Sequence, residues 1–264
     1  MKFSIKKVLL VSAGILTVFA ATGCSGIFGR NSHSDVKKAI SSVREQFGSD
    51  FKLKSKKPTL GALCNFTVTC SETGDREISV FQYDKKQPVR TDYIYVRYGA
   101  DAYSAIREAA EKTEQDCKVL VNDNAVNHYP NVEYDASTDL ASYLADNDFV
   151  IKVMIPEKLD KEGLIAEYKK LALSLRDSGI DCDTLILKCA DTKADYDALI
   201  LPDHIPHKTE QDLPSSSASF STSIYSVYRS LSEYCDDPDD LSDVLIEVDG
   251  VAVKKISGKS PFSK

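Results

Sequence analysis

Hydrophobic residues recur at intervals of three and four in four stretches of the chain, which is the spacing of a helix with one buried face. These stretches are 36–47, 102–113, 164–175 and 224–235. Ser34 or Asp35 is a suitable N-cap for the first helix, and Gly48 is a typical stop signal. The third stretch has the most regular apolar stripe and ends at Gly179. The pattern therefore predicts four amphipathic helices.

Other segments show the patterns that are typical of β-strands. Apolar and polar residues alternate over 60–70, and after a glycine turn a second strand returns over 78–83. Residues 149–155 and 184–187 are nearly continuous apolar runs, which predicts central strands covered on both faces. Asp249-Gly250 separates two short apolar segments and indicates a two-residue hairpin.

Short strings in the two halves resemble each other at a separation of about 120 residues, which suggests an internal duplication. Residues 70–84 match 189–203, residues 103–107 match 225–229, and residues 121–126 match 248–253. The alternative is that similar strands and helices produce similar short strings in unrelated segments. We expect an α/β or α+β fold of two related α-β-β-α-β-β units with mixed sheets. The expected domains are repeat A at 35–130, a connector with a short helix and a strand at 131–159, repeat B at 160–257, and a disordered tail at 258–264.

The first 23 residues have the parts of an export signal in the order that the export machinery reads them. Lys2, Lys6 and Lys7 form a cationic end, and residues 8–21 form an apolar segment without a charged residue. This segment is shorter than the roughly 20 residues that a membrane-spanning helix needs. The pattern favours a cleaved signal peptide over a permanent transmembrane anchor.

Ala21-Thr22-Gly23-Cys24 follows the apolar segment and resembles the lipobox of bacterial prolipoproteins, although the family prefers leucine where this chain has Ala21. The resemblance covers residues 1–24 and implies cleavage before Cys24 and attachment of lipid to its thiol. It implies a protein anchored at the extracytoplasmic face of the cell membrane. An ordinary secretory signal with a nearby cysteine is the alternative. Residues 24–34 have the composition of a flexible tether.

The formal charge of the chain is -7, and removal of residues 1–23 with their three lysines changes it to -10. An acidic surface repels phosphate backbones and anionic lipids, which argues against nucleic acid as a partner. We therefore expect membrane contact to come from the N-terminal lipid and not from a basic patch.

Six cysteines remain after Cys24, at positions 64, 70, 117, 182, 189 and 235. An even number in an exported chain permits disulfides, with 15 possible complete pairings. Most of these cysteines lie on the apolar side of a predicted strand or helix, where a free thiol behaves as a small buried hydrophobe. Disulfide bonds and free buried thiols both stay open at this stage. A bridge between Cys64 and Cys70 is excluded, because the two would lie about 20 Å apart along one strand.

The most closely spaced histidines are His204 and His207, and two imidazoles are half of a tetrahedral metal site. Pro206 between them disfavours a helix that would align them, so a solvated loop is the favoured interpretation. A run of carboxylates offers the hard oxygen ligands that calcium prefers, at Asp236, Asp237, Asp239, Asp240 and Asp243. The run lacks the spacing, glycine and distal glutamate of a calcium loop, so a charged helix-to-strand turn is favoured. We expect no metal and no cofactor.

Ser34 and Lys37 have the Ser-x-x-Lys spacing of penicillin-recognising enzymes, but the other motifs of those enzymes are absent and helix capping explains Ser34. Exposed tyrosines at 93, 95 and 98 are candidates for a sugar or peptide site, although packing on one face of a sheet explains them as well. The sequence contains no Gly-x-Ser-x-Gly, His-Glu-x-x-His or Cys-x-x-Cys motif and no phosphate loop.

These patterns favour a lipid-anchored envelope protein that is a non-catalytic binding module for a peptide, a wall component or an envelope protein. One alternative is a solute-binding lipoprotein of a transporter, with its ligand between two lobes. Another is an envelope hydrolase that uses unassigned aspartates and serines. Cys24 is the one site residue that the sequence assigns, and the ligand-binding residues stay unknown at this stage.

Overall fold

The structure of the protein is a computed structural model, which describes residues 31–57, 59–113, 116–123, 134–146, 149–206, 218–226 and 229–254. The fold is mixed α+β, with a four-stranded antiparallel sheet and a six-stranded mixed sheet. The chain divides after Val96 into two compact units, which we call unit 1 and unit 2. The signal peptide, Cys24 and the tail at 258–264 lie outside the described residues. No helix within the described ranges is long and apolar enough to cross a membrane.

Unit 1 consists of one helix on a small sheet, followed by the first residues of a second helix. Its elements are α2 (His33–Phe47), β1 (Lys52–Lys56), β2 (Cys64–Thr69), the 3-10 helix η1 (Ser71–Thr73), β3 (Ile78–Gln82) and β4 (Arg90–Thr91). The strands are ordered β1-β2-β3-β4, and every neighbouring pair is antiparallel. Helix α2 packs on β2 and buries Val36, Ala39, Val43 and Phe47.

The ends of α2 follow from local hydrogen bonds. The Ser32 hydroxyl accepts from the backbone N–H of Asp35, and Gly48 takes the left-handed conformation with φ 71° as the C-cap. The predicted stop at Gly48 is confirmed. The prediction of Ser34 or Asp35 as the N-cap was wrong because Ser32, one turn earlier, supplies the cap.

Residues 31–34 belong to the folded body and not to a tether. Asn31 is buried, and its backbone N–H donates to the Leu63 carbonyl at 3.1 Å while its side-chain oxygen accepts from the Asn65 N–H at 2.8 Å. Helix α2 begins directly afterwards at His33. The predicted tether at 24–34 was therefore too long at its C-terminal end, because the sequence does not show that Asn31 pairs with β2.

Unit 2 is built on the larger sheet, with strand order β10-β9-β8-β7-β6-β5. Its strands are β5 (Lys118–Asp123), β6 (Phe149–Ile155), β7 (Thr184–Cys189), β8 (Thr222–Ser226), β9 (Val244–Val248) and β10 (Val251–Lys254). Its helices are α3 (Tyr93–Glu111), which begins in unit 1, α5 (Leu140–Asp146), α6 (Lys161–Asp177), α7 (Lys193–Ala198) and α8 (Leu231–Asp236). Strands β6 and β7 are parallel and joined through α6, and the other pairs are antiparallel.

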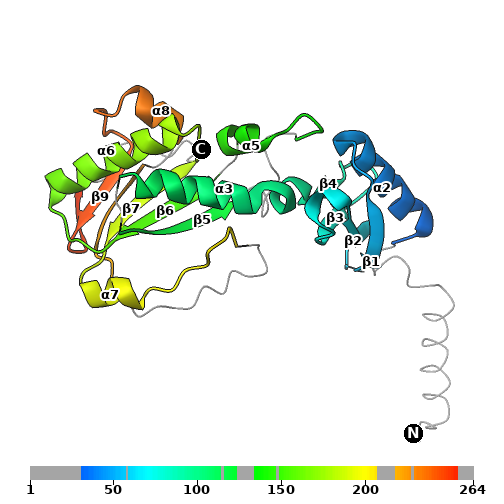
Figure 1. Cartoon of the computed structure of the whole chain (residues 1–264), viewed down its shortest axis with the longest axis horizontal. Helices are drawn as coiled ribbons and strands as arrows, with labels where there is room; N and C mark the ends of the chain where they lie inside the picture. The colour runs from blue at the N-terminus through cyan, green and yellow to red at the C-terminus, as the bar shows by residue number, and fades with distance from the viewer. Residues whose placement is uncertain are drawn as a thin grey trace, which may run out of the picture. The chain divides into compact units, whose positions relative to one another are not determined.

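The two faces of the large sheet are covered differently. Helix α6 lies along one face, and α7 lies on the opposite side (Figure 1). Alternate residues of β6 and β7 are buried beneath α6, and Tyr168 of α6 donates through its hydroxyl to the Leu185 carbonyl at 3.2 Å. The prediction of central strands is confirmed for β7, whereas β6 is an interior strand next to the edge strand β5. Their second face is only half-buried at several positions, so the expectation of full cover on both faces was wrong.

The structure does not show the predicted internal duplication. Residues 103–107 lie in α3, but the matching residues 225–229 begin in strand β8. The predicted helix at 224–235 is in fact the end of β8 followed by the short helix α8. Residues 78–82 form β3, whereas the equivalent part of 189–203 contains α7. The unit boundary after Val96 also falls inside the span that we assigned to repeat A.

Other expectations are confirmed by the element order. Asp249 and Gly250 both have positive φ, 53° and 73°, and join β9 to β10 as the predicted hairpin. The third predicted helix is α6, and the short connector helix is α5. All six cysteines after Cys24 are free thiols, and five of them are buried. Burial raises the pKa of the Cys64 thiol to about 11, so it is protonated and inert at neutral pH.

Candidate binding surface

The histidine pair does not form a metal site in the part of the chain that the structure describes. His204 is half-exposed, and its Nδ1 lies 3.3 Å from the carboxylate of its neighbour Asp203, while His207 lies outside the described residues. No group of three or more metal-ligating side chains occurs within the described ranges. The favoured interpretation of a solvated loop is consistent with the exposure of His204.

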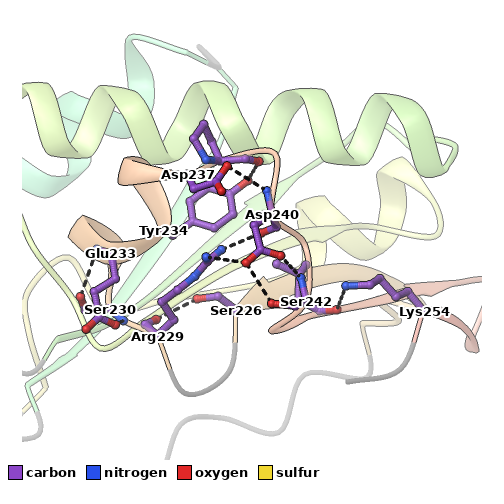
Figure 2. Close-up of polar contacts among 11 residues, drawn as sticks. Ser226, Arg229, Ser230, Glu233, Tyr234, Asp237, Asp240, Ser242 and Lys254 are labelled. Carbon is purple, nitrogen blue, oxygen red and sulfur yellow. Dashed lines mark hydrogen bonds and ion pairs between the residues drawn. The ribbon is translucent and has the colours of Figure 1, made fainter. Parts of the chain in front are cut away.

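The acidic run forms the charged turn between α8 and β9, as expected (Figure 2). The Asp240 carboxylate accepts from the Ser242 N–H at 2.8 Å, and this bond is the largest cause of its lowered pKa. Arg229 donates to the Asp240 carbonyl at 2.7 Å, and its guanidinium lies 5.2 Å from the centre of the Tyr234 ring. Asp239 pairs with Lys169 of α6. These carboxylates fasten a turn, and they do not converge on a common point.

The other candidates from the sequence are also dispersed. Ser34 lies in the first turn of α2, where its hydroxyl contacts the Ser32 hydroxyl at 3.1 Å. Tyr93, Tyr95 and Tyr98 lie on α3, so their placement on a sheet face was wrong. Tyr93 is fully buried, and its hydroxyl donates to Glu72 at 2.5 Å. These three tyrosines do not form a row of exposed rings.

A hydroxyl–carboxylate cluster in the described part of the chain lies where β7 ends and β8 begins. Asp191 accepts hydrogen bonds from the Ser221 N–H at 2.9 Å and from the hydroxyls of Ser219 and Ser221. Bonds from Ser219 and then Ser221 lower the pKa of this carboxyl group. A carboxylate with a lowered pKa is a weak general base, so Ser221 is poorly activated as a nucleophile. The cluster is better explained as a clasp that fixes the start of β8.

The second face of the six-stranded sheet, opposite α6, carries an unusual mixture of side chains. Alternation along the strands and the strand register place thirteen residues on this face. They are Lys118, Leu120, Asn122, Val150, Lys152, Met154, Thr184, Ile186, Lys188, Ser223, Tyr225, Leu245 and Glu247. Most of them are half-buried, unlike the fully buried residues beneath α6. We call this set the second face.

Two lysines lie side by side in the middle of the second face. Lys152 of β6 pairs with Ile186, and Lys188 of β7 pairs with Met154, two residues further along the parallel ladder. Strand spacing then separates their Cα atoms by about 8 Å. Burial, followed by the charge of Lys188, lowers the pKa of Lys152. No carboxylate contributes to that shift, and neither lysine forms a hydrogen bond or ion pair with another described residue.

Lys118, on the same face, differs from this pair because its ammonium group has hydrogen-bond partners. Its ammonium donates to the carbonyls of Tyr196 and Leu199, at 2.7 Å for Leu199, and lies 4.6 Å from the centre of the Tyr196 ring. Lys118 therefore has a structural role, holding the end of α7 against β5. Lys152 and Lys188 have no comparable contacts among the described residues, so folding alone does not explain them.

Apolar and aromatic groups surround the lysine pair. Ile186 lies beside Lys152 on β7, and Tyr225 of β8 pairs with Ile186. Burial and the charge of Glu247 raise the pKa of the Tyr225 hydroxyl, which stays protonated and able to donate. The surface therefore combines two ammonium groups, the Tyr225 phenol and the aliphatic side chain of Ile186. This combination suits a ligand with carboxylate groups and an apolar part.

The sequence contains a signal for this surface that hydrophobic periodicity alone does not reveal. Lys152 interrupts the apolar run 149–155, and Lys188 follows the run 184–187. A lysine within a central strand has to face a partner, solvent or a ligand, because burying an isolated ammonium is costly.

No family model, curated protein or solved structure matches the chain.

Proposed function

We propose that this protein is a lipoprotein of the cell envelope, and that its folded body is a non-catalytic binding module. The lipobox-like Ala21-Thr22-Gly23-Cys24 supports cleavage before Cys24 and lipid attachment to its thiol. The carrying observation for binding is the Lys152–Lys188 pair, which lies half-buried on an apolar sheet face without an acidic partner among the described residues. The ligand that fits is a peptide or envelope protein with an acidic segment.

An anionic ligand would relieve an unfavourable arrangement that the fold maintains. Partial burial disfavours the charged form of Lys152, and the like charge of Lys188 on the adjacent strand repels it. A carboxylate placed between them would offset both effects and form charge-assisted hydrogen bonds. Because the gain appears only when the ligand is bound, the pair favours association over stability of the free protein.

The alternatives have weaker support. A solute receptor with two similar lobes was suggested by the duplication, but unit 1 has a four-stranded antiparallel sheet and unit 2 a six-stranded mixed sheet. A hydrolase needs a nucleophile next to a competent base. In the hydroxyl–carboxylate pair of Ser221 and Asp191 the carboxylate has a lowered pKa, which makes it a weak base.

Zero-length carbodiimide cross-linking on intact cells tests the binding surface, because it joins lysines only to carboxylates in direct contact. We expect Lys152 or Lys188 to be joined to a carboxylate of another molecule, and the product to disappear in the K152Q/K188Q double variant. The matched control is K169Q/K170Q, which removes two lysines of α6 and should retain the product. Loss of the product in both variants, or cross-links that never involve Lys152 or Lys188, would refute the proposed surface.

The anchor is tested separately by the intact mass of the membrane-extracted protein. We expect a chain that begins at residue 24 and carries the added mass of lipid, and we expect Cys24→Ala to abolish that addition. An unmodified N-terminus in the wild-type protein would refute the lipoprotein assignment while leaving the cross-linking result standing.

A further inference from the structure

The entry point of the chain into unit 1 fixes which part of the body lies near the anchor. Asn31 is held by three hydrogen bonds: its N–H donates to the Leu63 carbonyl, its side-chain oxygen accepts from the Asn65 N–H, and its carbonyl accepts from the Lys56 ammonium at 3.2 Å. Only the six residues 25–30 separate Asn31 from Cys24. The seven Cα–Cα steps between the two residues span at most about 25 Å when fully extended. If Cys24 carries lipid, the part of unit 1 around Asn31 is held close to the bilayer.

Three segments meet at this end of unit 1. They are the start of α2, the loop between β1 and β2, and the loop between β3 and β4. The Leu63 N–H donates to the carbonyls of Gln82 and Tyr83, both at 2.9 Å, which joins the two loops. Asn31 joins the start of α2 to Leu63. We call the surface of these three segments the Asn31 end.

The Asn31 end is strongly basic. Five lysines lie on its three segments, at positions 37, 38, 57, 85 and 86, and Lys56 follows at the end of β1. Its own carboxylates are those of Asp35 and Asp84, and Lys57 also lies 4.0 Å from the Glu77 carboxylate. Both carboxylates are occupied locally, because Asp35 accepts from Ser32 at 2.6 Å and Asp84 accepts from the Lys86 N–H at 2.7 Å. The lysines at 37, 38, 85 and 86 are exposed and form no ion pair with another described residue.

The charge of the whole chain is divided unequally between the units. Residues 31–96 contain 11 lysines and arginines against 8 aspartates and glutamates, a formal charge of +3. Residues 97–264 contain 18 against 32, a formal charge of -14. The net acidity that led us to expect no basic patch comes from unit 2. An anionic bilayer attracts the unit that lies next to the tether and repels the other.

Apolar groups and a hollow accompany the lysines. Leu60 of the β1–β2 loop is 68% exposed and Tyr83 of the β3–β4 loop is 46% exposed. A cavity of about 190 Å³ lies between α2 and the β3–β4 loop, with Lys38, Lys85 and Gln82 among its lining residues. It has room for a small anionic group. Its wall carries two ammonium groups and the carboxylate of Asp35, which accepts a hydrogen bond from Ser32.

We propose that the Asn31 end faces the membrane that holds the lipid anchor, with its lysines on anionic lipid headgroups and Leu60 at the interface. This inference rests on the proposed lipidation of Cys24. A basic patch next to a lipid chain provides the second attachment signal that stable anchoring requires. The surface therefore has two effects, because it strengthens attachment and it orients unit 1.

Hydrogen–deuterium exchange of the mature lipidated protein tests this orientation. The protein is placed in vesicles of phosphatidylcholine, or of phosphatidylcholine mixed with an equal part of phosphatidylglycerol. We expect amides of 59–63 and 83–87 to exchange about threefold or more slowly in the anionic vesicles, with the difference lost at high salt. Residues 44–50, at the other end of α2, are the internal control and should not change.

Two four-lysine variants separate local charge from total charge. Glutamine at positions 37, 38, 85 and 86 should abolish the protection, whereas glutamine at positions 161, 169, 170 and 193 of unit 2 lowers the net charge equally and should leave it intact. Equal exchange in both vesicle types, in a sample whose mass shows lipid on Cys24, would overturn the membrane-facing surface alone. If Cys24 carries no lipid, the lipoprotein assignment fails. The Asn31 end can then be tested independently, by flotation of the mature Cys24→Ser chain with the two vesicle types.

Discussion

At the scale of single residues, the clearest structural role belongs to Asp191. Its carboxylate collects one backbone donor and two hydroxyl donors from Ser219 and Ser221, and the Asp191 N–H donates back to the Ser219 carbonyl at 3.1 Å. This clasp fixes the residues that enter β8. Because the donors favour the ionised form, the folded state holds Asp191 at a lower pKa than the unfolded chain does.

Asp191→Ala should lower the free energy of unfolding by about 1–2 kcal/mol at pH 7, because charge-assisted hydrogen bonds to β8 are lost. The wild-type advantage is present above the ordinary pKa of 3.8 and is lost as pH falls through the lower folded-state pKa. Urea denaturation at pH 7 and at pH 3 should show a difference that shrinks on acidification. Asp197→Ala, which removes an exposed ion pair with Lys193, is the control and should cost about 0.5 kcal/mol or less. A pH-independent difference would mean that the carboxylate charge is irrelevant.

At the scale of elements, the hairpin between β9 and β10 depends on two residues with positive φ. Gly250 has φ 73°, and a Cβ atom added there would meet nothing within 4 Å. The cost of a side chain at this position is therefore conformational and not steric. The Gly250 N–H also donates to the Ser221 carbonyl at 2.7 Å, which ties the turn to the residue before β8.

Gly250→Ala should destabilise the protein by about 1 kcal/mol, because an L-residue disfavours the left-handed region. Gly250→Asn should cost less, since asparagine tolerates that region. Thermal or urea unfolding of the two variants measures the difference. Equal losses in the two variants would show that the backbone conformation is not the cause.

Local sequence patterns predicted most helices and strands. Where these patterns failed, contacts between residues far apart in the sequence decided the structure. Helix α6 and the hairpin at Asp249-Gly250 were predicted because each is encoded within a few adjacent residues. The stretch 224–235 was read as one helix, since Ile224, Leu231 and Cys235 also fit a helical period. In the structure Ile224 pairs with Leu187 and Ile246 in the sheet, and the Ser230 capping box starts a separate helix. Pairing with distant strands decided between two patterns that the local sequence allowed.

The candidate surfaces were harder to predict than the fold. The lysines at 152 and 188 are 36 residues apart and become neighbours only through the parallel register of β6 and β7. Asn31 has the local sequence of a tether, but its bonds to Leu63 and Asn65 place it in the folded body. Sequence patterns identify which side chains are unusual, but register and long-range hydrogen bonds decide which of them meet.

At the scale of the whole molecule, the concentration of negative charge in residues 97–264 should affect stability. A formal charge of -14 is self-repulsive, and added salt screens that repulsion. We expect the melting temperature to rise by a few degrees between low and moderate sodium chloride, as measured by scanning calorimetry. Choline chloride should raise the melting temperature by the same amount, because the effect depends on ionic strength. A melting temperature that rises with only one of the two salts would indicate specific ion binding instead.

The boundary between the units lies inside α3, only one turn after that helix begins at Tyr93. Tyr93 is fully buried in unit 1, with its ring centre 4.9 Å from that of Phe47 and 5.1 Å from that of Phe51. Unit 1 thus completes its core with a residue from a helix whose remaining turns belong to unit 2. A gene fragment ending at Val96 would keep a single unsupported turn, too short to stay helical. The two units are therefore not interchangeable modules: a recombination event at their border would leave Tyr93 on a turn without the rest of α3, and the aromatic core of unit 1 would lose the helix that holds this ring in place.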